Sequence, residues 1–154
     1  EVMNGEYWRL FTSTFVHSGF MHIIMNLIVL WILGMFLEPL LGSLRYLIIY
    51  IICGVTASFV SINYHENIVS VGASGAIFGL FGLLLAFNIF KVFENGIRGY
   101  LWMILVMYGG VSLLFGIRDG VDNSAHFGGL ICGFVIACII LLFQKNELIE
   151  KAKE

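Results

Sequence analysis

The sequence predicts an all-α fold, a polytopic membrane helix bundle. Of its 154 residues, 60% are hydrophobic and only 12% are charged, whereas soluble domains are about half apolar and one-quarter charged. The mean hydropathy is +0.97. Five apolar runs, separated by polar or glycine-containing breaks, are each close to the roughly 17–25 residues that a helix needs to cross a bilayer. We therefore expect one membrane domain over residues 1–154.

The elements follow from the breaks between these runs. Residues 1–18 mix aromatic and polar side chains, which is typical of an interfacial external loop. Proline at 39 and glycine at 42 end the first helix. Polar or charged segments at 63–71, 91–98 and 117–123 supply the later breaks. The five transmembrane helices are expected at about 19–41, 44–62, 74–92, 99–116 and 124–143, with a cytoplasmic tail at 144–154.

Orientation follows from the distribution of basic residues. If the spans alternate, one side of the membrane holds Arg45, Lys91, Arg98, Lys145, Lys151 and Lys153. The opposite side holds only Arg9 and Arg118. The positive-inside rule makes the first side cytoplasmic, so the first residue lies outside. Because the chain opens at Glu1 with no signal-peptide pattern, we expect a preceding span that this excerpt lacks.

Charge and cysteine content exclude several classes of function. The formal net charge is -2, and no basic patch is present, so we expect no nucleic-acid partner. Cys53, Cys132 and Cys138 all fall inside apolar runs without metal-ligand or redox spacing. They are interpreted as small core or lipid-facing residues.

Two polar side chains interrupt the first apolar run. His22 and Asn26 are four residues apart and therefore share one helix face. Buried polar groups in a span need a partner or a water-filled cavity. They are either a pair of helix-bridging hydrogen bonds or part of a site.

The third helix opens with the glycine-rich stretch 72–79, which contains a single hydroxyl, that of Ser74. Gly75 and Gly79 form a small-xxx-small edge that lets another helix approach closely. A membrane-helix serine often bonds only to its own backbone. A helix N-terminus, however, offers free N–H groups and a positive dipole end, which suit a developing oxyanion.

His126 lies near the start of the fifth helix, and Gly129 and Gly133 follow on the same stripe. Two glycine-edged helices can dock closely, which would bring Ser74 and His126 within hydrogen-bonding reach, as nucleophile and base of acyl transfer. His126 could otherwise be a satisfied core histidine. No third, acidic member is evident, because Asp119 and Asp122 lie in the preceding loop, so we expect a dyad.

The chain resembles a rhomboid intramembrane serine protease. The resemblance rests on Trp8-Arg9, the segment from His17 to Asn26, the 72–79 motif and the segment from Ala125 to Gly129. These motifs cover nearly the whole chain in family order. The main departure is the first helix of the six-helix core, which this excerpt lacks.

The resemblance implies the following roles. Ser74 is the nucleophile and His126 the general base, while His22, Asn26 and the backbone N–H of Ser74 stabilise the oxyanion. Phe78 occupies a position where the family has an aromatic ring, frequently tyrosine, stacked on the catalytic histidine. Arg9 in the external loop and Glu38 are structural.

The expected activity is cleavage of transmembrane protein substrates near the outer leaflet, with the lipid bilayer as the other partner and no metal or cofactor. We expect a multi-pass protein of a bacterial cytoplasmic membrane whose active site opens to the extracytoplasmic side. The alternatives are a non-catalytic rhomboid-like protein that binds client helices, and a transition-metal site or transporter built from His17, His22 and His126. The second lacks acidic or thiolate ligands at metal spacing.

Overall fold

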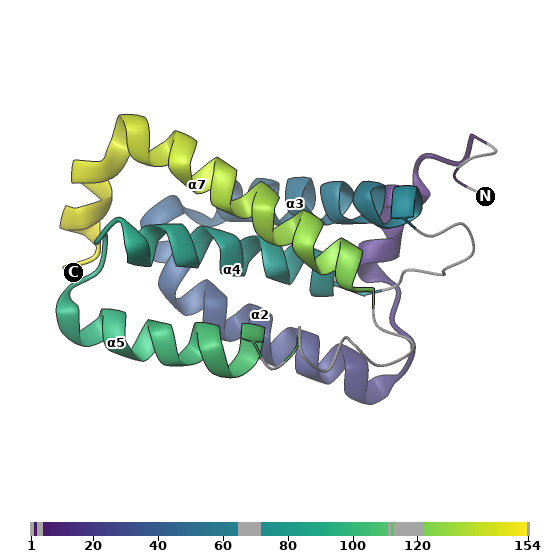
Figure 1. Ribbon diagram of the computed structural model, residues 1–154, viewed down its shortest axis with the longest axis horizontal. Coiled ribbons are helices and arrows are strands. Elements are labelled where there is room, and N and C mark those ends of the chain that lie inside the picture. Colours follow the sequence, from purple (N-terminus) through teal and green to yellow (C-terminus); the bar gives the residue numbers. More distant parts are fainter. Residues whose placement is uncertain (1, 3–4, 65–71, 111, 113–121, 154) are drawn as a thin grey trace.

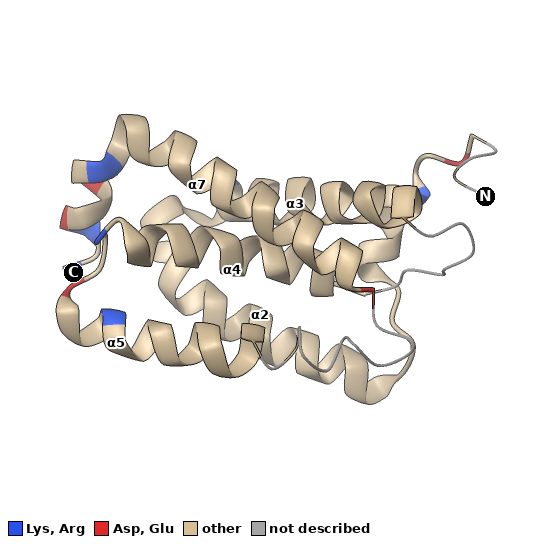
Figure 2. Cartoon of the chain, viewed as in Figure 1, with Lys and Arg blue, Asp and Glu red and all other residues tan. Residues whose placement is uncertain are grey.

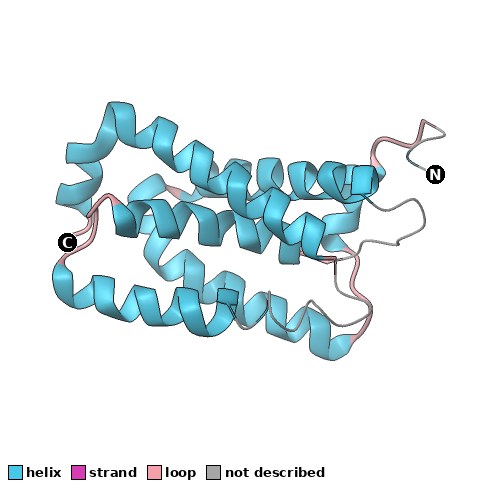
Figure 3. Ribbon diagram, viewed as in Figure 1, coloured by secondary structure: helices cyan, strands magenta, loops and turns pink. Residues whose placement is uncertain are grey.

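The described part of the chain is all-α. The computed structural model describes residues 2, 5–64, 72–110, 112 and 122–153, and these contain no strand (Figure 3). Figure 1 shows the long helices lying roughly alongside one another. The elements, in chain order, are α1 (Arg9–Thr12), the 3-10 turn η2 (Ser13–Phe15), α2 (Phe20–Leu41), α3 (Ser43–Tyr64), α4 (Ser74–Ile89), α5 (Asn95–Ile104), the π-helical η3 (Leu105–Gly110) and α7 (Asn123–Lys151).

Helix α4 is the centre of the bundle. Nearly every side chain from Gly75 to Asn88 is buried, which explains why this helix is apolar on all sides. Its largest contact is with α7, and α3 packs against both of them. The contacts of α4 with α2 and α5 are much smaller. Among the described helices, α3, α4 and α7 therefore make the most extensive mutual contacts, and they run alongside one another in Figure 1.

The outer helices present apolar side chains outward. Three helices, α2, α3 and α7, are long and apolar enough to cross a membrane, whereas α4 is shorter, at 16 residues. Large side chains such as Trp31, Phe59 and Leu142 are mostly exposed. Such a surface is stable against lipid tails and unfavourable in water. Figure 2 shows charged residues near the two ends of the bundle and a long uncharged stretch between them.

Several helix boundaries differ from the sequence predictions. Helix α4 ends at Ile89 instead of 92, because the chain turns at Lys91, where φ is 61°. Helix α5 starts at Asn95 instead of 99 and passes into a π-helix at Leu105. The rest of that expected span, and most of the 63–71 and 117–123 loops, lie outside the described residues. The external loop contains the short helix α1 and the turn η2.

The helix that contains the expected span 124–143 continues as α7 to Lys151, so the expected tail is helical as far as that residue. Several charged residues after 143 pair along the helix surface. Lys151 Nζ lies 2.7 Å from Glu147 Oε1, four residues earlier. Charge pairs at this spacing support helix formation. The buried Leu148 also anchors the last turns to the core.

Arg9 and Glu38 make local contacts at opposite ends of the molecule. Arg9 Nε donates to Glu6 beside α1. Glu38 accepts a hydrogen bond from Ser43 Oγ across the junction between α2 and α3. This second contact holds the sharp turn at Gly42, whose φ of 80° favours glycine.

Candidate active site

Ser74 and His126 lie side by side at one end of the bundle. Ser74 is the first residue of α4, and His126 is in the first turn of α7. The Ser74 Oγ and His126 Nε2 atoms are 3.1 Å apart, and the histidine is 6% exposed. A hydroxyl hydrogen-bonded to a buried imidazole is the pairing that nucleophilic acyl transfer requires.

Glycine contacts between α4 and α7 set this distance. A methyl group on Gly129 would collide with the carbonyl oxygen of Gly75, and one on Gly133 would collide with that of Gly79. Because no side chain separates the two backbones at these positions, the helices pack more closely than residues larger than glycine would allow. All four glycines expected to pack here therefore meet at this contact. Gly82 extends it one turn further, against the carbonyl oxygen of Leu130.

An aromatic ring fixes the plane of the His126 imidazole. The Phe78 ring, one turn below Ser74, stacks on it with centroids 4.2 Å apart and an angle of 13° between the planes. Phe78 is itself 2% exposed and packs against Phe81. The stack restricts rotation of the imidazole and keeps Nε2 directed at the serine.

His22 and Asn26 form a second polar cluster, which faces the backbone at Gly72, two residues before Ser74. Gly72 has a φ of +117°, and a Cβ atom there would lie 2.8 Å from His22 Cε1 and 3.6 Å from Asn26 Nδ2. His22 and Asn26 therefore converge on the backbone that leads into Ser74. Asn26 is 5% exposed, and its Nδ2 has no hydrogen-bond partner in the described part of the chain. A buried donor without a partner is costly in a folded protein, and it is suited to a charge that forms only during a reaction.

Neighbouring groups orient the side chains of His22 and His17. Ser18 Oγ lies 3.0 Å from His22 Nδ1. When the hydroxyl donates, the proton of the neutral imidazole lies on Nε2, which makes Nε2 a donor. His17 packs edge-on against His22, with ring centroids 5.1 Å apart, and its Nδ1 lies 3.2 Å from the Phe15 carbonyl oxygen. His17 does not contact Ser74 or His126 through any hydrogen bond between described residues.

Asp122 caps the helix that carries His126. Its Oδ1 accepts hydrogen bonds from the Ala125 backbone N–H at 3.0 Å and from Ser124 Oγ at 2.6 Å. Its Oδ2 accepts from Ser61 Oγ of α3. His126 Nδ1 has no hydrogen-bond partner among the described residues. The described hydrogen bond of the imidazole is therefore the one to Ser74, and Asp119 lies outside the described residues.

Two contributors, Ser18 and Ser61, have no signal in the sequence, because a serine near a helix end is common and its partner is set by tertiary structure. Asp122 does have one, since an aspartate just before a helix is a typical N-cap. Considered from the sequence only as a possible acid, it acts in the structure as a cap.

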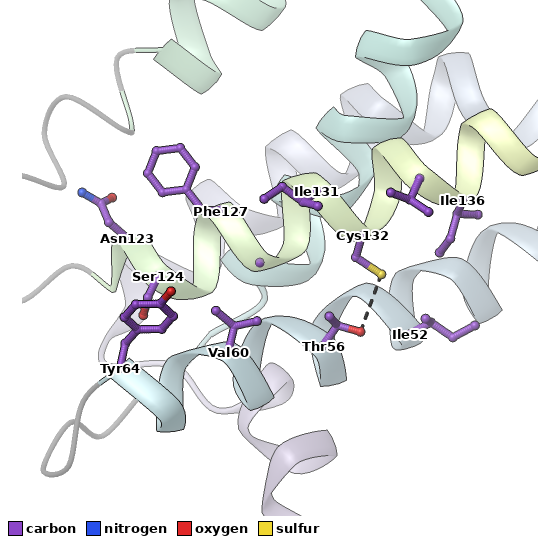
Figure 4. Close-up of a pocket in the computed structure, with 12 residues that line it drawn as sticks. Ile52, Thr56, Val60, Tyr64, Asn123, Ser124, Phe127, Ile131, Cys132 and Ile136 are labelled. Atoms are coloured by element: carbon purple, nitrogen blue, oxygen red, sulfur yellow. Dashed lines mark hydrogen bonds between the residues drawn. The ribbon is translucent and has the colours of Figure 1, made fainter.

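A groove lies beside the site but does not contain it. It has a volume of about 780 Å³ and runs between α3 and α7, from Tyr64 and Ser124 at one end past Val60 to Ile52 and Ile136 (Figure 4). Neither Ser74 nor His126 lines it. Halfway along it, Cys132 Sγ donates to Thr56 Oγ1 at 3.6 Å.

Comparisons with known proteins identify the fold family. The family model described as the Rhomboid domain matches residues 4–143. RHOMBOID-like protein 5 of Arabidopsis thaliana is 40% identical over 145 residues, which are 92% of this chain and 46% of that protein. Rhomboid protease GluP of Bacillus subtilis is 39% identical over 142 residues, covering 90% of this chain and 27% of GluP. Putative rhomboid protease YdcA, also of Bacillus subtilis, is 35% identical over 149 residues, covering 95% and 72%.

Proposed function

Because this chain belongs to the rhomboid family, we propose that it is an intramembrane serine endopeptidase that cleaves transmembrane helices of membrane proteins. The observation that carries the proposal is the 3.1 Å contact between Ser74 Oγ and His126 Nε2. In this role Ser74 is the nucleophile and His126 the general base and acid. Relatives named as rhomboid proteases support the reaction class. The chain spans less than half of several of its relatives, so the activity of the whole protein is part of the proposal.

The first step forms an acyl-enzyme. His126 Nε2 accepts the Ser74 proton while Oγ attacks the scissile carbonyl carbon. The resulting oxyanion is held by His22 Nε2–H, Asn26 Nδ2–H and the Ser74 backbone N–H, which is among those left free at a helix N-terminus. The imidazolium then gives its proton to the leaving amine as the peptide C–N bond breaks.

The second step releases the acyl group. A water molecule gives a proton to His126 Nε2 and attacks the acyl carbonyl carbon, through the same oxyanion contacts. Collapse of that intermediate returns the proton to Ser74 Oγ and frees the carboxylic acid product. The two steps consume one water molecule and need no metal or organic cofactor.

Substrate choice follows from the helical state of a transmembrane segment. A helix has its carbonyl groups bonded within its own backbone, so it must unwind before Ser74 can attack. Segments with glycine, proline or other poor helix formers near the cleaved bond lose less free energy in unwinding. We propose that these are the preferred substrates, approached from the extracytoplasmic half of the membrane.

The family and the three long apolar helices make this chain an integral membrane protein. The distribution of basic residues supports an extracytoplasmic position for the end that carries Ser74 and His126. Relatives occur in both a bacterium and a plant, and we propose the bacterial cytoplasmic membrane as the location.

Labelling with a serine-reactive fluorophosphonate tests the proposal. The protein is reconstituted in lipid vesicles and compared with Ser74→Ala and His126→Ala, alongside cleavage of a transmembrane substrate with a glycine-containing outer end. We expect labelling and cleavage in the wild type and neither in the two variants. Unchanged labelling of Ser74→Ala would refute the nucleophile, while tight substrate binding without labelling or cleavage would favour a client-binding protein.

Asn26→Ala is expected to lower kcat by about 10²–10³-fold with little change in KM, because one oxyanion donor is lost. The matched control is Asn88→Ala, which removes another fully buried carboxamide, at the far end of α4, where Asn88 Nδ2 donates to the Arg98 carbonyl oxygen. That variant is expected to lose thermal stability and to keep its kcat within about threefold. Equal losses of kcat in both would contradict an oxyanion role for Asn26. Initial rates at several substrate densities in the bilayer measure both constants.

Ser18→Ala is expected to lower kcat by about tenfold. Without its hydroxyl, His22 Nδ1 loses the donor that keeps the proton on Nε2, and the imidazole divides between its two neutral forms. Ser18→Thr keeps a hydroxyl at this position and should recover most of the rate. The nitrogen chemical shifts of a ¹⁵N-histidine-labelled sample report the protonated nitrogen directly. An unchanged His22 tautomer in Ser18→Ala would show that the Ser18 hydroxyl does not keep the proton on Nε2.

A further inference from the structure

Asp122 joins two helices at the point where the proposed catalytic histidine begins its helix. One carboxylate oxygen accepts from the first turn of α7, through Ala125 N–H and Ser124 Oγ. The other accepts from Ser61 Oγ on α3, and Ser61 is 2% exposed. The same side chain therefore holds α7 internally and ties it to its neighbour.

The backbone alone holds the start of α7 weakly. The His126 N–H donates to the Asp122 carbonyl oxygen at 3.3 Å, which is longer than the usual 2.9–3.0 Å of such bonds. The first N–H groups of any helix also lack partners within the helix. His126 lies in this first turn, so its position depends on contacts from outside α7.

Contacts with α3 and α4 fix α7 on two sides. Gly129 lies against the Gly75 carbonyl oxygen of α4. A Cβ atom on Gly128 would lie 2.8 Å from Val60 of α3. Nearly two turns before Gly128 and Gly129, the described polar contact between α3 and the start of α7 is the one between Ser61 and Asp122. Without it, the first turn of α7 could fray or rotate and carry the imidazole away from Ser74.

We propose that Asp122 is a positioning residue which, through its hydrogen bonds to Ser61 and to the first turn of α7, holds His126 in line with Ser74. The expected effect of Asp122 on the reaction rate rests on the proposed function. The role is exerted through the helix, because the carboxylate oxygens accept hydrogen bonds from Ser61, Ser124 and Ala125. Asparagine can keep these links, since its oxygen can accept from the first turn of α7 and its Nδ2–H can donate to Ser61 Oγ.

Two serines that donate to the same carboxylate provide a matched pair of variants. Ser61→Ala removes the tie between helices, whereas Ser124→Ala removes a hydroxyl within α7 itself. We expect the rate of fluorophosphonate labelling to fall about fivefold in Ser61→Ala and to stay within twofold of wild type in Ser124→Ala. Asp122→Ala should fall about 10- to 100-fold, since misplacement by about 1 Å can cost about 10²-fold. Asp122→Asn should remain within about threefold, since asparagine caps helices as well as aspartate does.

A second measurement does not depend on activity. In a ¹⁵N-histidine-labelled sample in lipid nanodiscs, the His126 Nε2 signal in wild type should differ from that in Ser74→Ala, because the hydrogen bond to the hydroxyl is lost there. The signal in Asp122→Ala should move toward that of Ser74→Ala, and the signal in Asp122→Asn should not. This readout decides the inference even if the wild type neither labels nor cleaves, an outcome that would count only against the proposed function.

Three results would overturn the inference. The first is wild-type labelling together with a wild-type His126 signal in Asp122→Ala. The second is equal behaviour of Ser61→Ala and Ser124→Ala. The third is a defect in Asp122→Asn as large as that in Asp122→Ala, which would assign the effect to negative charge. If Asp122→Ala does not fold, the two serine variants decide the matter.

Discussion

Replacing His126 with alanine is expected to lower kcat for cleavage of a transmembrane substrate by about 10⁴- to 10⁶-fold. In the proposed mechanism the imidazole accepts the serine proton across the 3.1 Å contact, and no other described side chain hydrogen-bonds to the hydroxyl. Because nucleophile and base act as one unit, the double variant Ser74→Ala/His126→Ala should be no slower than either single variant. Product formation in reconstituted vesicles, followed over days by mass spectrometry, measures rates slow enough to detect a loss of this size.

His17 supplies the control for this prediction. It is a second histidine at the same end of the molecule, it touches His22, and it makes no described hydrogen bond to Ser74. His17→Ala should therefore stay within about tenfold of wild type. A loss in His17→Ala as large as that in His126→Ala would mean that the general base has been misassigned.

Gly133→Leu is expected to destabilise the protein by at least about 3 kcal/mol, the upper part of the range for overpacked sites. Even a methyl group on Gly133 would collide with the carbonyl oxygen of Gly79, and backbone cannot move aside as a flexible side chain can. The α4–α7 contact is the largest between the described helices. Because Ser74 and His126 lie on these two helices, separating them also separates the two side chains. Both the unfolding midpoint in mixed micelles and the labelling rate should fall sharply.

Gly99→Leu is the matched substitution in open space. Gly99 lies in α5, and nothing lies within 4 Å of the position that its Cβ atom would take. Leucine is a better helix former than glycine by up to about 1 kcal/mol, so stability should be equal or slightly higher. If Gly133→Leu were as stable as Gly99→Leu, the close approach of α4 and α7 would not be what holds the site together.

The sequence predicted the long helices well, because apolar runs and their breaks are local signals. The beginnings of α4 and α7 were predicted within one residue, at Ser74 and Asn123. The far ends were predicted less well. The end of α7 depends on burial of Leu148 and on charge pairs along the helix, which a hydropathy pattern does not weigh.

The meeting of Ser74 and His126 could be predicted from glycine spacing, since small residues four apart mark a close helix contact. The contacts that orient the site could not. Ser18 and Ser61 act through partners whose position depends on the tertiary structure. At position 72 the sequence shows a glycine, but it does not show that its φ is +117° or that it lies beside His22.

The extension of α3 beyond the start of α4 has a consequence for where a substrate of the proposed protease can be cut. Gly75 meets Ala57 of α3, and α3 continues beyond that level to Tyr64, a rise of about 10 Å. The reactive hydroxyl is thus recessed by about two helical turns from the end of α3. Under the proposed function, this recess sets the depth of cleavage: the bond that is cut is the one held about 10 Å below the end of α3. Lengthening the outer half of a client helix by one turn should move the cleaved bond by about one turn, even where the local sequence is unchanged.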